Sequence, residues 1–326
     1  MLKCEYTEIL KGSLQSMRKK AFTLAETLAT LGVIGIVAAL MIPSVVANYN
    51  NHIFKTSKET FRATLSDSVR IMAATESKLN KAKNYTDEDN EENNRSANEV
   101  FVEDHFSNYI KFAKICDPEQ AGGIYNCGWI NDKVYKSMNS DDKLNIPTKN
   151  SDVGFDSDEK LWSAITVNGM SLLIAYNPDC KSFNNAENDA EENKQDETDK
   201  GFHPKETACI NIIYDINGVA KPNTFGKDVG IATVYYPRTA RVGVPIFTNN
   251  AEYVTGISSF ESAEEYCYNL SYKKKATLPT LEEAGSIYLN SKPLLNSDSH
   301  EKVWFSSAKE EKSAGYTAGS VICVNR

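Results

Sequence analysis

The stretch KKAFTLAETLATLGVIGIVAALMIP, residues 19–43, decides the fold class of this chain. It leads into a run of 19 residues without a charge, from Leu28 to Val46. As an α-helix such a run is about 28 Å long, enough to cross the hydrocarbon core of a bilayer. Arg18, Lys19 and Lys20 stand on the N-terminal side of this run, and positive residues hold their side of a helix in the cytoplasm. The sequence therefore predicts one membrane-crossing helix with the C-terminal bulk of the chain on the far side.

Two ordinary interpretations of this segment are a plain membrane anchor and a secretory signal peptide. A signal peptide needs small residues after its apolar run, and Val45 to Ala47 supplies such a site. Glu26 argues against both, because an unpaired carboxylate within an apolar segment costs roughly 2.5 to 3.5 kcal/mol even on lenient insertion scales. A charge that costly needs a partner.

The stretch resembles the cleavage and methylation segment of type IV pilins and of the pseudopilins of type II secretion systems. The family pattern is a group of basic residues, a small residue, Phe, Thr, Leu, any residue and Glu, then an apolar helix with a glycine and a later proline. Ala21 takes the small position, where most members have Gly, and FTLAE (22–26) follows in order. Counted from Phe22, Gly35 is the fourteenth residue and Pro43 the twenty-second, as in the family.

The resemblance implies that a prepilin peptidase cuts between Ala21 and Phe22 and methylates the new amino group of Phe22. In filaments of this family Glu26 is expected to meet the N-terminal amine of a neighbouring subunit, so that its charge is neutralised only when subunits stack. Pro43 is expected to let the packed helix bend. The partners implied are other pilin-like subunits, the prepilin peptidase and an inner-membrane assembly platform.

The function implied is that of a structural subunit, a pilin or pseudopilin, of a type IV pilus or type II secretion filament. The chain would begin as a single-pass precursor in the bacterial inner membrane. It would end in a cell-envelope or extracellular filament, with its globular part in the periplasm or outside. The expected domains are a leader (1–21), the helix (22–80), a pilin-like globular domain (81–235) and a C-terminal unit (236–326).

Beyond the membrane the helix is predicted to continue and to seat the globular domain. Apolar residues recur there at helical spacing and predict a stripe that faces a core: Phe54, Phe61, Leu65, Val69, Met72 and Leu79. Val100 to Lys114 is predicted to form a short amphipathic helix.

From Leu161 the pattern changes to strands. LWSAITVNGMSLLIAY (161–176) carries Asn168-Gly169 between two β-prone runs, a strong hairpin signal. The expected fold is α+β: a long N-terminal helical spine, half transmembrane and half amphipathic, packed on an antiparallel β-sheet, with a small disulfide-closed C-terminal α+β unit.

The seven cysteines become six once Cys4, which lies in the leader, is set aside. The six fall into three sequential couples and predict three disulfides in an oxidising compartment: Cys116 and Cys127, Cys180 and Cys209, Cys267 and Cys323. The sequence alone leaves their connectivity open. A zinc site is the rival interpretation, but there is no CxxC, and the four histidines lie away from the cysteines.

DINGVAKPNTFGKD (215–228) offers oxygen donors near a glycine in Asp215, Asn217 and Asp228, and calcium sites occur in some pseudopilin domains. The segment lacks the spaced acidic positions and terminal Glu of an EF-hand loop. A type I′ turn at Asn217-Gly218 followed by a Pro/Gly loop is favoured. The three residues remain a weak metal candidate, and no cofactor is predicted.

The C-terminal unit resembles the small C-type-lectin-like domain appended to various bacterial envelope proteins. The matching segments are SFESAEEYCYNL (259–270), Leu278-Pro279-Thr280 with Glu283, Trp304 to Ser307 and SVICVNR (320–326). Ala276 stands where that family often has Trp. The resemblance supports an alternative function, a minor or tip subunit that adheres to a glycan or another surface ligand through this unit.

Composition and motifs exclude other classes of function. The formal net charge is −8, with acid concentrated in residues 87–99 and 187–199, which is not the pattern of a nucleic-acid binder. There is no GxSxG, HExxH or P-loop motif. The sequence therefore predicts that the chain is not an enzyme.

Overall fold

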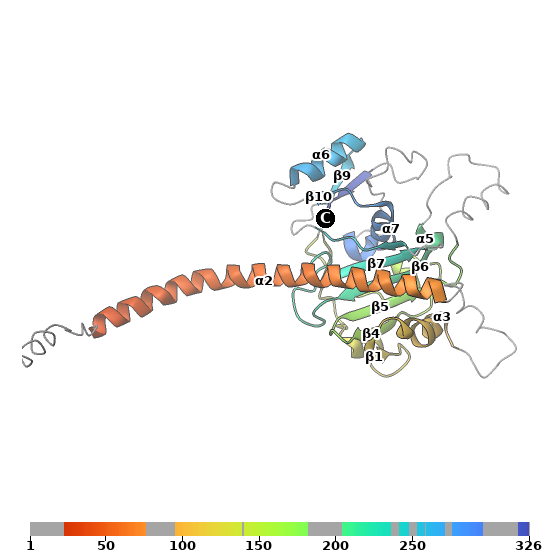
Figure 1. The fold of residues 1–326 in the computed structure, drawn as a ribbon, viewed down its shortest axis with the longest axis horizontal. Helices are drawn as coiled ribbons and strands as arrows, with labels where there is room; N and C mark the ends of the chain where they lie inside the picture. Colours follow the sequence, from red (N-terminus) through yellow and green to blue (C-terminus); the bar gives the residue numbers. More distant parts are fainter. Residues whose placement is uncertain are drawn as a thin grey trace, which may run out of the picture. The chain divides into compact units, whose positions relative to one another are not determined.

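The computed structural model describes residues 23–75, 95–138, 140–181, 204–235, 241–247, 253–257, 259–270, 276–295 and 319–325. The chain divides into two compact units, Met1–Asn50 and Asn51–Arg326. A single continuous helix, α2 (Leu24–Thr75), contributes to both (Figure 1). Among the described residues α2 alone is long and apolar enough to cross a membrane, judged by length and composition. The fold is α+β, as predicted.

The second half of α2 packs through the stripe that the sequence indicates. Phe61, Leu65, Val69 and Met72 are buried and Phe54 is half-buried. Leu79 lies outside the described residues.

An antiparallel sheet of six strands forms the centre of the second unit, in the order β1-β4-β5-β6-β7-β8. The strands are β1 (Phe112–Cys116), β4 (Trp162–Thr166), β5 (Ser171–Tyr176), β6 (Ala208–Asp215), β7 (Val229–Tyr235) and β8 (Arg241–Gly243). The β4–β5 hairpin predicted around Asn168-Gly169 is confirmed. It pairs Trp162 with Ile174 and Ile165 with Ser171.

Both faces of the sheet are buried, which explains why β6 is buried along its whole length. Ile210, Ile212 and Tyr214 belong to the core that contains the α2 stripe. The ring of Tyr214 lies 4.8 Å from that of Phe61, centroid to centroid. Ile213, one residue away from two of them, belongs to the core on the opposite face, as the two-residue period of a strand requires.

The opposite face is covered by the C-terminal part of the chain, coloured blue in Figure 1. This part contains β9 (Tyr253–Ile257), α6 (Phe260–Leu270), β10 (Ala276–Thr277), α7 (Leu281–Leu289), α8 (Ser291–Leu295), β11 (Gly319–Ile322) and β12 (Val324–Asn325). β9 pairs with β11 and β10 with β12, both antiparallel. Residues on both sides of the expected boundary at 235/236 share one core, and β8 beyond it completes the sheet.

Shorter elements connect these layers: η4 (Gly123–Cys127), β2 (Tyr135–Lys136), β3 (Lys143–Leu144), η5 (Asn150–Val153) and α5 (Pro204–Thr207). The predicted helix Val100–Lys114 is only partly correct. Helical turns cover α3 (Ala97–Val100), the π-turn η2 (Phe101–His105) and η3 (Phe106–Asn108), and β1 then begins at Phe112. The cause is tertiary, because Phe112 to Cys116 pairs with β4 at the sheet edge.

The turn predicted at Asn217-Gly218 is corrected. A type I′ turn needs positive φ at both central residues. Asn223 is the one described non-glycine residue with positive φ, at 51°. Asn217 therefore does not adopt the left-handed conformation, and residues 216–228 form a longer loop between β6 and β7.

Candidate functional site

The N-terminus of α2 is capped by hydrogen bonds between Thr23 and Glu26. The backbone N–H of Thr23 donates to Glu26 Oε2 at 2.9 Å. In return, the backbone N–H of Glu26 donates to Thr23 Oγ1 at 3.2 Å. This is a capping box, which satisfies two backbone donors that a helix start leaves free. Glu26 therefore has a local role as well as its expected role in assembly.

The first half of α2 is apolar on every side and exposed. The side chains of five residues point in different directions around the helix and are 61% to 65% exposed: Leu28, Leu31, Val33, Ile34 and Ile36. A helix that is apolar all round requires an apolar surrounding, either lipid or other helices. Pro43 lies within the helix, which continues through it. Ala21 and Phe22, the expected cleavage and methylation sites, lie outside the described residues.

All three disulfides join the sequential couples that the sequence suggests. Cys116 pairs with Cys127, Cys180 with Cys209, and Cys267 with Cys323. The first closes the glycine-containing loop behind β1. The second fixes the start of β6 to the segment after β5, and the third joins α6 to the residue between β11 and β12.

The candidate oxygen donors of residues 215–228 are partly brought together. Asp215 ends β6 and Asp228 precedes β7, and both side chains are fully buried. Asp228 accepts from the backbone N–H groups of Asn223 (2.7 Å) and Thr224 (2.8 Å), so it organises the loop. Burial, together with the nearby Asp228, raises the pKa of Asp215 to about 8.

Lys58 of α2 supplies a positive charge beside this loop. Its Nζ donates to the carbonyl of Gly226 at 2.7 Å, and the residue is 4% exposed. Burial lowers the pKa of Lys58 to about 8, although the negative charge of Asp228 acts in the other direction.

This geometry gives little support to a metal site at Asp215, Asn217 and Asp228. Asp215 Oδ2, Asn217 Oδ1 and Asn223 Oδ1 are buried without a hydrogen-bond partner. However, the residues that the structure describes contain no group of three or more His, Cys, Asp or Glu side chains placed to hold a metal. The positive charge at Asp228 comes from Lys58.

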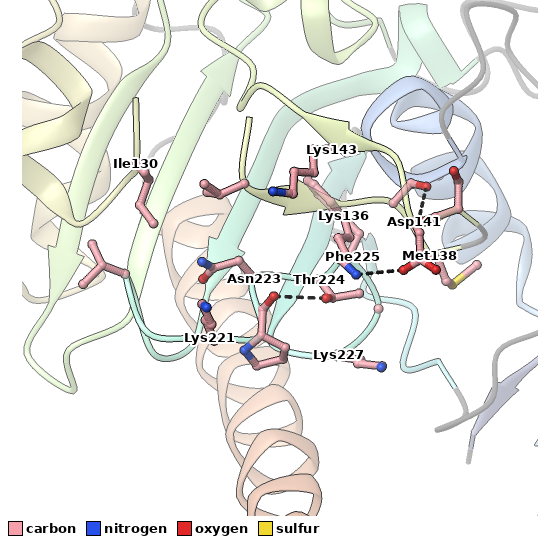
Figure 2. A pocket seen from close by; sticks show the side chains of 16 residues that line it. Ile130, Lys136, Met138, Asp141, Lys143, Lys221, Asn223, Thr224, Phe225 and Lys227 are labelled. Atoms are coloured by element: carbon pink, nitrogen blue, oxygen red, sulfur yellow. Dashed lines mark hydrogen bonds and ion pairs between the residues drawn. The ribbon is translucent and has the colours of Figure 1, made fainter. Parts of the chain in front are cut away.

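A groove of about 880 Å³ opens on the outer side of the same loop (Figure 2). One wall comes from β2, β3 and the segment between them, and the other from residues 219–227. The walls are joined by backbone hydrogen bonds, because the Lys136 N–H donates to the Asn223 carbonyl and the Phe225 N–H to the Lys136 carbonyl, each at 2.9 Å. Four lysines line the groove and define what we call the lysine groove: Lys136, Lys143, Lys221 and Lys227.

The motif Leu278-Pro279-Thr280 with Glu283 has a clear local role. Thr280 precedes α7, and its backbone N–H donates to Glu283 Oε2 at 2.9 Å, while the Glu283 N–H donates back to Thr280 Oγ1 at 3.3 Å. Glu283 also lies 3.7 Å from Arg62 on α2. Trp304 to Ser307, the third segment of the lectin-like pattern, lies outside the described residues.

Two features of the second unit were missed by reasoning from the sequence. Lys58 occupies a position in the α2 stripe, and the gap of seven residues between Phe54 and Phe61 was the available signal. The lysine groove gave no sequence signal, because its lysines come from two separate segments of an acidic chain.

Comparison of the chain with protein-family models, with curated proteins and with solved structures finds no match.

Proposed function

We propose that the chain is a non-catalytic structural subunit of a cell-envelope filament of the type IV pilin and pseudopilin class. The observation that carries the proposal is the change of surroundings along one continuous helix. The run from Leu28 to Val46 is free of charge, and its large apolar side chains are exposed on all sides of the helix. From Phe61 to Met72 a single stripe is buried against the sheet.

This division suits a helix that moves between two apolar environments while its C-terminal half stays fixed to a domain. In the precursor the first half would lie in the inner membrane, which satisfies its apolar surface. In a filament, the same surface would pack against the corresponding helices of other subunits. Lipid and neighbouring helices are both apolar, so the transfer costs little hydrophobic energy.

Glu26 supports assembly over permanent anchoring. It lies at the start of the apolar half, where the positive end of the helix dipole favours a negative charge. Removal of residues 1–21 would place a new amine at Phe22, four residues away along the chain. A neighbouring subunit would then offer that amine to Glu26, so that charge pairing sets the stagger between subunits.

The test is the N-terminus of the processed protein. The chain is produced together with a prepilin peptidase, extracted from the membrane and analysed by N-terminal sequencing and intact mass. The expected product begins at N-methylated Phe22. A product that begins after Ala47 indicates signal peptidase, and a product that keeps residues 1–21 indicates a plain anchor. Either result overturns the proposal.

A pair of variants makes this test specific. Ala21→Leu enlarges the small residue before the expected cut and should leave the precursor uncleaved. Ala25→Leu makes the same change four residues later, inside α2, and should be processed normally. Normal processing of both variants would show that the junction at Ala21 and Phe22 is not what the enzyme reads.

A further inference from the structure

The lysine groove is positively charged on a chain whose formal net charge is −8. Four lysines line it and a single carboxylate, that of Asp141, lies among them. Lys136 Nζ lies 2.7 Å from Asp141 Oδ1 (Figure 2). That pair neutralises itself, so the groove keeps three further positive charges.

Those three charges belong to Lys143, Lys221 and Lys227. All are exposed, and none forms an ion pair with another described residue. The hydrogen bond and charge of Lys136 hold the pKa of Asp141 below its usual value, and Lys227 contributes to the same shift. Lys136 and Lys227 therefore both lie close enough to act on one carboxylate, that of Asp141. Lys143 and Lys221 line the same groove.

The groove is a shaped site as well as a charged surface. Its volume lies in the range typical of ligand pockets, roughly 300 to 1,000 Å³, at about 880 Å³. Its walls carry the apolar side chains of Ile130, Val134 and Met138 and the half-buried hydroxyl of Ser140. Apolar contacts suit the C–H faces of a sugar ring, while hydroxyl groups can exchange hydrogen bonds with sugar hydroxyls.

The composition of the groove favours an acidic sugar over a nucleic acid. The lining contains no arginine, the side chain that pairs with phosphate through two parallel hydrogen bonds. Its one aromatic residue, Phe225, is 1% exposed and offers no platform on which a base could stack. Lysines act as separate point charges, which suits isolated carboxylates or sulfates along an oligosaccharide.

We propose that the lysine groove binds a short acidic oligosaccharide, with Lys143, Lys221 and Lys227 contacting its carboxylate or sulfate groups. The assignment goes beyond the proposed function, because filament assembly does not require it. It also differs from the lectin-like alternative, since the groove lies between β2, β3 and the β6–β7 loop. A subunit with this site would give a filament affinity for acidic surface polysaccharides.

The experiment measures binding to the full-length processed chain in detergent micelles by isothermal titration calorimetry. The probe is a galacturonic acid trimer, and its neutral counterpart is a galactose trimer of the same linkage. The acidic trimer should bind saturably and at least about tenfold more tightly than the neutral one, because the lysines recognise charge. Binding should weaken as sodium chloride is raised, since salt screens exposed charges.

Lysine variants test whether the acidic trimer binds in the groove. Lys143→Gln and Lys221→Gln should each weaken binding about threefold, and the double variant about tenfold, as expected for exposed charges. Lys111→Gln, which removes another exposed lysine away from the groove, should leave the affinity unchanged. Because all three side chains are exposed, the melting temperature should stay the same in every variant.

Several results would overturn the proposal. They are an absence of saturable binding by the acidic trimer, equal binding of the neutral trimer, or unchanged affinity in the Lys143/Lys221 double variant. Two competing anions are included in the same assay. Tighter, groove-dependent binding of a single-stranded oligonucleotide would assign the site to nucleic acid. Tighter binding of a peptide of residues 187–199 would instead assign it to an acidic segment of a neighbouring copy.

Discussion

Lys58 of α2 donates a hydrogen bond of 2.7 Å to the carbonyl oxygen of Gly226 in the loop before β7. The bond is buried and links residues that are 168 positions apart in the sequence. Asp228, two residues beyond Gly226, provides the opposite charge, and Asp215 lies next to it. The helix is thus held to the sheet by a polar contact in addition to its apolar stripe, and this contact makes stability depend on pH.

Between about pH 5 and 8, the change of stability with pH should come from Asp215. Its pKa is about 8 in the folded chain and near 3.9 in an unfolded one. Between these values the folded state holds a proton that the unfolded state has released. The free energy of unfolding should therefore fall as pH rises from about 5 to 8, by up to about 1.4 kcal/mol per pH unit.

Asp215→Asn cannot titrate and should remove this fall. Urea unfolding, followed by the fluorescence of the buried Trp129 and Trp162, measures the effect at each pH. Glu264→Gln, a change at an exposed carboxylate of α6, should keep the slope of the original protein. An unchanged slope in Asp215→Asn would assign the pH dependence to other groups.

Above about pH 8, the change of stability with pH should come from Lys58. Its pKa is about 8 in the folded chain and near 10.4 when unfolded. In this window the unfolded state binds the extra proton, so the free energy of unfolding should rise from about pH 8 to 9.5. Higher pH is avoided, because burial raises the pKa of Tyr135 to about 12 and unfolding then releases tyrosine protons.

Lys58→Met keeps most of the side-chain volume and removes the titrating group. The rise above pH 8 should disappear in this variant, whatever its absolute stability. Lys55→Met, a change at an exposed lysine one turn earlier on the same helix, should keep the rise. A rise that persists in Lys58→Met would show that the buried ammonium is not its source.

The apolar stripe of α2 can be tested with two substitutions on one helix. Leu65 is fully buried, whereas Ile71 is 52% exposed. Leu65→Ala should lower the free energy of unfolding by about 2 to 5 kcal/mol, because it removes buried methyl groups and leaves a cavity. Ile71→Ala should change it by less than about 1 kcal/mol. Equal losses in urea unfolding would contradict the packing of α2 on the sheet.

The sequence was sufficient for features that repeat with a regular period or pair locally. The α2 stripe follows the helical period, and the β4–β5 hairpin surrounds Asn168-Gly169, whose glycine has a φ of 83°. Of the three cysteine couples, Cys116 and Cys127, 11 residues apart, are local in this sense. In these cases the residues that meet are close in the sequence or share one element, so a short window contains the information.

Sequence patterns did not predict features that depend on contacts between distant segments. Phe112 to Cys116 continues an amphipathic pattern, yet it forms a strand because β4 offers its edge. Asn211 and Asn290 form two reciprocal amide hydrogen bonds, each 3.1 Å long, across the buried face of the sheet. The lysine groove likewise requires two segments to lie side by side. No local pattern encodes such contacts.

The disulfides should differ in their effect on stability. Cys267 and Cys323 are 56 residues apart, and Cys116 and Cys127 are 11 apart. Because a longer closed loop restricts the unfolded chain more, Cys267→Ala/Cys323→Ala should cost about 1.4 kcal/mol more than Cys116→Ala/Cys127→Ala. Urea unfolding of the two double variants measures the difference. The opposite order would show that chain entropy does not dominate their contribution.

Glu26 is where local structure and assembly can be separated by experiment. Glu26→Ala removes both the charge and the capping bond to Thr23, whereas Glu26→Gln removes the charge and keeps an oxygen that can accept from the Thr23 N–H. If the charge pair sets the subunit stagger, both variants should be cleaved before Phe22 yet be absent from sheared filaments. Thr23→Val, which loses only the hydroxyl part of the cap, should still be incorporated. Filaments built normally from Glu26→Gln would show that Glu26 serves as a helix cap and that its charge is not needed for assembly.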